Sequence, residues 1–149
     1  MENGWIEINN NIEKYLEDII HEYRMKVIKI GPLSTALVGR GFALVITIDR
    51  FSADVSYLFR DKSNELILLP CGNFFAEKFT KEDRENLIQN NNAVDIIIND
   101  LIIINKGLVN KWSNVLKGDT SWINDFVASK WNEKMRLTSE EEQIIEKYI

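Results

Sequence analysis

Residues 41–70, GFALVITIDRFSADVSYLFRDKSNELILLP, decide the fold of this chain. Apolar side chains alternate along Phe42–Ile48 and again along Asp54–Arg60, which is the pattern of strands that bury one face. A short turn-like stretch follows each run, and residues 65–69 then resume strand character. Connections this short favour antiparallel neighbours. With a further strand expected over Leu33–Val38, the sequence predicts an antiparallel meander of about four strands.

Helical patterns flank this block on both sides. Apolar residues recur at helical spacing over residues 11–23, which predicts an N-terminal helix. A long helix is expected over residues 93–117, stopped by Gly118. Shorter helices are expected after Thr80, after Asp119 and after Thr138, each of which has the character of a helix cap.

The predicted fold class is therefore α+β. We expect an N-terminal helix and then the meander. A long helix and shorter C-terminal helices follow, packed on one face of the sheet. The length of 149 residues fits a single domain, residues 1–149.

Composition narrows the classes of protein. Cys71 is the only cysteine, so no intramolecular disulfide is expected. The first ten residues lack a basic stretch followed by an apolar one, and the most apolar stretch, residues 94–104, is short and carries two aspartates. We therefore expect a cytoplasmic protein that does not enter a membrane. A net charge of −5 opposes nucleic-acid binding, which needs a basic face.

The excess acid is concentrated in the middle of the chain. Residues 51–100 carry nine acidic and five basic residues. One interpretation is a solvated acidic surface that keeps the protein soluble. The other is a face complementary to a basic protein partner.

Side chains suited to catalysis are scarce. His21 and Cys71 are each the only residue of their kind, so no zinc site or nucleophile with a nearby base is predicted, and no cofactor is expected. Carboxylates flank two turns and could in principle act as acid and base. Aspartate is common in turns for backbone reasons, so we predict that the chain is not an enzyme.

Two groups of residues are candidates for contacts with other molecules. The candidate partner-binding residues are Asp49, Asp54, Asp61, Glu65 and Trp131. Ile96 and Ile103 fall on the outer side of the predicted long helix, away from its core-facing stripe. Either another part of the same chain covers these isoleucines or a second copy does, which would make them a homodimer contact.

Residues 41–78 and the later stretch LKGDTSWINDF, residues 116–126, also carry a family resemblance. Both resemble small bacterial proteins that look like immunity proteins of polymorphic toxin systems. Such proteins bind and block one cognate toxin domain, so the resemblance implies a protein partner, most concretely a basic toxin domain. The alternatives are a small ligand-binding or enzymatic domain that uses the turn carboxylates, and a structural homo-oligomer.

Overall fold

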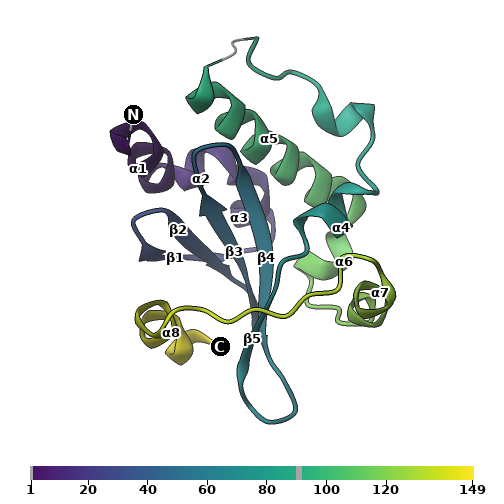
Figure 1. Ribbon diagram of the computed structural model, residues 1–149. Helices are drawn as coiled ribbons and strands as arrows, with labels where there is room; N and C mark the ends of the chain where they lie inside the picture. The colour runs from purple at the N-terminus through teal and green to yellow at the C-terminus, as the bar shows by residue number, and fades with distance from the viewer. Residues whose placement is uncertain (1, 90–91) are drawn as a thin grey trace.

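The computed structural model describes residues 2–89 and 92–149 and confirms the predicted α+β class (Figure 1). Its centre is an antiparallel meander in which every strand pairs with the next one in the chain. The strands are β1 (Lys26–Gly31), β2 (Ser34–Val38), β3 (Phe42–Ile48), β4 (Ala53–Arg60) and β5 (Leu66–Leu69). Strand β1 adds one strand to the expected four. It was missed because two lysines interrupt its apolar alternation.

The helix expected over residues 11–23 forms as two short helices, and a third helix that was not expected precedes them. These are α1 (Glu2–Asn10), α2 (Ile12–Tyr15) and α3 (Glu17–Glu22). The first break falls at Asn11, whose side-chain Nδ2 donates to the Glu7 carbonyl at 2.8 Å. Asparagine side chains compete in this way for backbone groups, which weakens a helix.

The long helix ends earlier than predicted. Helix α5 (Ala93–Lys111) is followed by a break at Trp112 and by the short helix α6 (Ser113–Leu116). The Trp112 indole N–H donates to the Phe75 carbonyl at 2.9 Å, and its ring is buried. This long-range anchor turns the chain at Trp112. Gly118 then adopts a φ of +97° and ends this helical stretch, as predicted.

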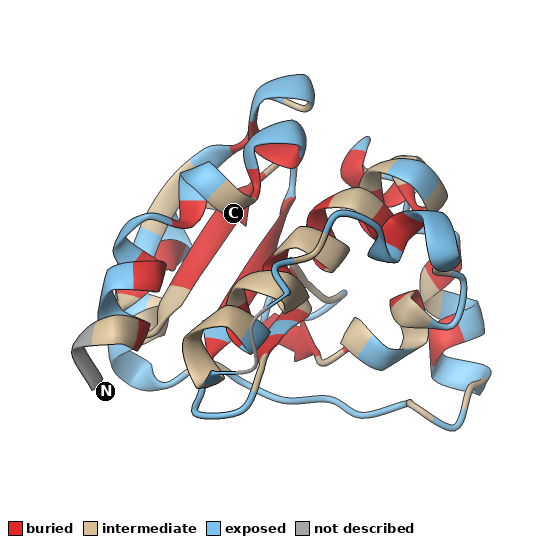
Figure 2. Ribbon diagram, turned by 90° about the horizontal axis from the view of Figure 1, so that it is seen from above, coloured by how far each residue is buried: buried red, intermediate tan, exposed pale blue. Residues whose placement is uncertain are grey.

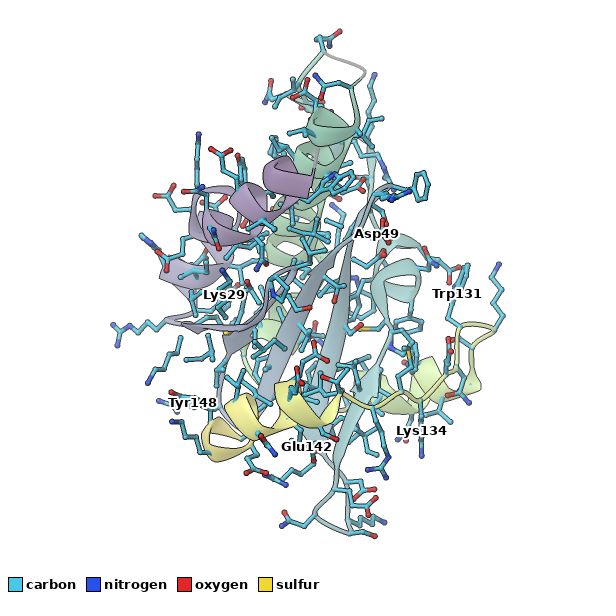
Figure 3. The ribbon with its side chains drawn as sticks, turned by 60° about the vertical axis from the view of Figure 1, so that its left-hand side comes forward. Lys29, Asp49, Trp131, Lys134, Glu142 and Tyr148 are labelled. Carbon is cyan, nitrogen blue, oxygen red and sulfur yellow. The ribbon has the colours of Figure 1, made fainter. Side chains whose placement is uncertain are left out.

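Helices cover both faces of the sheet, whereas the long helix and the C-terminal helices were all expected on one face. The N-terminal helices, α5 and α7 (Trp122–Ala128) contribute to the core on one face. The C-terminal helix α8 (Ser139–Ile145) lies across the other face and is followed by a 3₁₀ turn, Glu146–Tyr148 (Figure 3). The sequence of β3 accounts for helix α8 on this second face. Ala43 and Val45 of β3 point away from α5, and α8 helps to bury these apolar side chains. Figure 2 shows the buried positions running along the strands.

Residues 72–89, in the segment between β5 and α5, pack along the outer side of α5. They include α4 (Gly72–Ala76) and a 3₁₀ turn, Lys81–Arg84, that begins with the predicted Thr80–Asp83 capping box. Polar side chains of α5 hold this segment: Asn99 bonds both backbone groups of Ile88, and Lys106 donates to the Glu85 carbonyl. The polar outer side of α5 is therefore partly covered by its own chain.

Candidate functional site

The turn between β3 and β4 presents the most exposed large hydrophobic side chain among the described residues. Phe51 is 81% exposed. The Asp49 carboxylate holds the turn, accepting from the Phe51 N–H at 2.7 Å and the Ser52 N–H at 2.9 Å. The Asp49 N–H closes it by donating to the Ser52 carbonyl at 3.0 Å. Phe51 is therefore displayed on a turn whose backbone is already ordered.

A pocket of about 350 Å³ opens beside this turn, between β4, α4 and α5. Asp54 from β4 and Asp100 from α5 both line it, and Arg84 and Asn73 supply further polar atoms. Ile103, Ile104 and Phe79 form its apolar wall. The pocket thus combines this apolar wall with two carboxylates and one guanidinium group.

Asp100, which lines this pocket, has a raised pKa. Burial raises the pKa of Asp100, and the negative charges of Asp54 and Asp49 raise it further. The Ala53 N–H, which donates to Asp100 Oδ2 at 3.1 Å, acts in the opposite direction. A cation bound in the pocket would therefore stabilise the ionised form of Asp100.

Asp49 and Asp54 do not share this pocket. Asp54 lines it, and its carboxylate also accepts from the Ser52 hydroxyl at 3.1 Å. Asp49 lines a second, more apolar pocket on the opposite side of the turn. Both side chains are exposed, and the two residues lie on either side of the β3–β4 turn, at the same end of the sheet.

Asp61 and Glu65 lie at the other end of β4. This strand has eight residues, so its ends are roughly 23 Å apart at about 3.3 Å per residue. The Asp61 carboxylate orders the β4–β5 turn by accepting from the Ser63 and Glu65 N–H groups, and Glu65 forms an ion pair with Arg136. The four predicted acids therefore form two separate groups, and the first of them, Asp49 and Asp54, adjoins a pocket and an exposed aromatic.

Trp131 is partly buried and already interacts with neighbouring side chains of its own chain. Its indole N–H donates to Glu77, and the Lys130 ammonium lies 4.9 Å from its ring centroid. Figure 3 shows Trp131 apart from Asp49, on the segment that follows α7. Phe51, which was not among the predicted residues, is the exposed aromatic. Its position inside a short turn was the available signal, because a turn residue has no strand face to bury it.

The two isoleucines of α5 have different surroundings. Ile103 lines the Asp54–Asp100 pocket and lies against neighbouring elements of its own chain. Ile96 is 45% exposed. A homodimer contact through these residues stays a prediction.

The lone cysteine and histidine do not form a reactive pair in this fold. Cys71 is fully buried, and burial raises the pKa of its thiol. His21 is exposed on α3. Within the described part of the chain, no three His, Cys, Asp or Glu side chains are arranged to hold a metal ion.

Comparison with known proteins adds no family assignment. No protein-family model, curated protein or solved structure matches this chain. Over residues 2–89 and 92–149, no helix has the length and hydrophobicity needed to cross a bilayer.

Proposed function

We propose that the chain is a non-enzymatic binding protein that engages a protein partner through the β3–β4 turn. The observation that carries this proposal is Phe51, exposed to 81% on a turn ordered by Asp49. Aromatic residues displayed on an ordered backbone are frequent anchors of protein interfaces, because little conformational entropy is lost on binding.

The charges around Phe51 favour a basic partner. Three carboxylates, those of Asp49, Asp54 and Asp100, lie within or beside the turn and outnumber the two guanidinium groups, Arg50 and Arg84. The charges of Asp54 and Asp49 also raise the pKa of Asp100, which burial has already raised. A cationic partner would relieve this mutual repulsion and would be steered towards the turn during association. In its most concrete form, the proposal is that the chain is an immunity protein that neutralises a cognate toxin domain in the cytoplasm. The resemblance of residues 41–78 and 116–126 to such proteins supports this form.

Co-expression with the toxin domain encoded by the neighbouring reading frame tests this function. The wild-type chain is expected to protect cells and to bind the purified toxin domain. Phe51→Ala should weaken binding by about 30-fold, the effect of losing roughly 2 kcal/mol at an interface anchor. Val127→Ala on α7 is the matched control, because Val127 is another exposed apolar side chain, at 46%. If the wild-type chain neither protects cells nor binds the toxin domain, the proposal is wrong.

Electrostatic steering provides a second measurement. Asp54→Asn should slow association and make it less sensitive to salt, while leaving dissociation nearly unchanged. Asp125→Asn on α7, which removes an exposed carboxylate elsewhere on the surface, should leave the association rate close to that of the wild type.

The pocket beside the turn favours a second candidate, a domain that binds a small cationic ligand. Its volume of about 350 Å³ and its two carboxylates suit an amine or guanidinium group. Titration with arginine methyl ester, followed by the backbone amide signals of Ala53 and Asp100, tests this candidate. Saturable shifts that Asp100→Asn abolishes would support it, and unchanged signals would rule out this ligand class.

A further inference from the structure

A pocket at the other end of β3 from the β3–β4 turn is lined by three basic residues and by no acidic one. It lies where the β2–β3 turn meets the C-terminal ends of α3 and α6, and its volume is about 430 Å³. The basic residues are Arg24, Arg40 and Lys117, and its apolar wall is formed by Tyr23, Val38 and Leu116. We call it the Arg40 pocket.

The charge of the Arg40 pocket is opposite to that of the chain as a whole. The chain has 23 acidic and 18 basic residues, and the two pockets beside the β3–β4 turn each include at least one carboxylate. Asp119 follows Lys117 closely in the chain, but it does not line the pocket. Its carboxylate accepts from Asn114 and Ser121 within its own turn. The three cations therefore line the pocket without a carboxylate to offset them.

The three basic side chains of the pocket are exposed and have no partner among residues 2–89 and 92–149. No ion pair and no side-chain hydrogen bond of this part of the chain involves them. Basic side chains elsewhere have structural contacts: Arg136 pairs with Glu65, and Arg60 donates to three main-chain carbonyls. The hydrogen-bond donors of the pocket are therefore available to a ligand.

Arg24 occupies a position that normally favours glycine. It follows α3 with a φ of +53°, and the Met25 N–H donates to the Ile20 carbonyl at 3.0 Å, which is the bonding pattern of a Schellman helix end. The other non-glycine residues with positive φ in the described chain are Asn64 and Asn86, and asparagine tolerates this conformation. An arginine held in a disfavoured backbone conformation points to a function for its side chain.

The backbone that carries Arg40 is ordered before any ligand binds. The Gly39 N–H donates to the Phe42 carbonyl at 2.9 Å and closes the β2–β3 turn around Arg40 and Gly41. Gly41 has a φ of +78°, which glycine adopts without strain. A ligand that pairs with Arg40 therefore need not order this turn, which reduces the entropy lost on binding.

The number of charges indicates a phosphate group. A phosphate monoester carries close to two negative charges at pH 7, whereas a carboxylate carries one, so three cations match the phosphate better. Guanidinium groups pair with phosphate oxygens through parallel hydrogen bonds. The apolar wall suits an apolar or aromatic group attached to the phosphate. The pocket volume of about 430 Å³ lies within the range of small-molecule sites.

We infer that the Arg40 pocket binds a small phosphate monoester that carries an apolar or aromatic group. Arg24, Arg40 and Lys117 bind the phosphate, and the apolar wall contacts the attached group. This site is separate from the β3–β4 turn, which lies at the other end of β3, so the inference and the proposed function do not depend on each other.

Titration of the purified full chain with phenyl phosphate tests the site. In ¹⁵N-labelled protein, the backbone amide signals of Gly39 and Arg40 report on the pocket, and the signal of Ser63 in the β4–β5 turn is the reference. We expect saturable shifts of the two pocket signals and a constant reference. Benzoate, which has the same ring and one charge, should bind about tenfold more weakly, and phenol should shift neither pocket signal.

A matched pair of variants separates the pocket from the general charge of the surface. Lys117→Gln should weaken the binding of phenyl phosphate by about tenfold, because it removes a hydrogen bond between two charged groups. Lys62→Gln makes the same change in the β4–β5 turn and should retain wild-type affinity. Both lysines are exposed, so circular dichroism should show both variants folded.

Arg24→Gly distinguishes a binding role from a structural one. Glycine adopts a positive φ without strain, so this variant should melt a few degrees above the wild type. It should also bind phenyl phosphate about tenfold more weakly. A variant that binds as tightly as the wild type would remove Arg24 from the site and contradict the inference.

Three other results would overturn the inference. The first is a set of shifts that do not saturate, or equal affinities for phenyl phosphate and benzoate. The second is an equal loss of affinity in Lys117→Gln and Lys62→Gln, which would indicate a general effect of charge. The third is a phosphotyrosine peptide that binds far more tightly than phenyl phosphate, which would assign the pocket to a protein ligand in place of a small molecule.

Discussion

The carboxylate of Asp83 holds the segment between β5 and α5 against the outer side of α5, and its removal should be costly. The Asp83 side chain is fully buried. It accepts from the Thr80 N–H at 2.8 Å and from Asn110 Nδ2 at 2.8 Å, and it lies 3.4 Å from the Lys111 ammonium. Asp83→Ala deletes all three interactions and leaves their donors without this acceptor.

The expected loss is about 2–3 kcal/mol in the free energy of unfolding. Removing one partner of a buried ion pair typically costs about 3–5 kcal/mol, because the remaining charge stays buried without compensation. Here the Lys111 side chain is 23% exposed and can recover part of its hydration, which lowers the cost. Glu82→Ala is the matched control, since this neighbouring carboxylate is exposed and its loss should change stability by less than about 0.5 kcal/mol.

Urea unfolding at pH 7, followed by circular dichroism, measures both variants. A double-mutant cycle with Lys111→Met isolates the ion pair from the two hydrogen bonds. A loss below about 1 kcal/mol for Asp83→Ala, or a loss equal to that of Glu82→Ala, would refute the reasoning.

The same carboxylate predicts a dependence on pH. Burial alone would raise the pKa of Asp83, but the hydrogen bonds from Thr80 and Asn110 and the charge of Lys111 outweigh burial, and the pKa falls below its ordinary value of 3.8. The folded state therefore binds this proton less tightly than the unfolded state. The stabilisation is complete above pH 3.8 and is lost as the pH falls through the lowered folded-state pKa. The stability gap between the wild type and Asp83→Asn should narrow over that range.

Three further predictions concern other parts of the fold. Gly107→Ala would place a Cβ 2.3 Å from the Phe79 ring, so it should destabilise the chain by about 1–3 kcal/mol in thermal unfolding; in a Phe79→Ala background the same change should stabilise α5. Ile145→Ala removes a fully buried side chain of α8 and should cost about 2–5 kcal/mol, with increased binding of a hydrophobic dye if the sheet face beneath α8 becomes accessible. Asp100→Asn should stabilise the chain at pH 7 by less than about 1 kcal/mol. Burial and the charges of Asp54 and Asp49 raise the pKa of Asp100, so its ionised form is disfavoured in the fold. The gain in stability should therefore shrink as the pH falls through the raised pKa and vanish below about pH 4.

The amino-acid sequence alone predicted the parts of the fold that depend on neighbouring residues. The alternation in Phe42–Ile48 identified β3, and the predicted cap at Thr138 marked the start of α8. Gly118 was correctly predicted as a helix stop, because its positive φ is a local property that glycine adopts without strain. In each case the deciding interactions lie within a few positions of one another along the chain.

Only the tertiary structure decided which distant residues meet. The break at Trp112 depends on a carbonyl 37 positions earlier, and the raised pKa of Asp100 depends on carboxylates from the β3–β4 turn. Separation along the chain also concealed that Asp54 of β4 and Asp100 of α5 line one pocket. Alternation and capping residues are properties of a single strand or helix, so they can be recognised in a short stretch of sequence. A site depends on how helices and strands pack against one another, and that packing is decided by the whole chain.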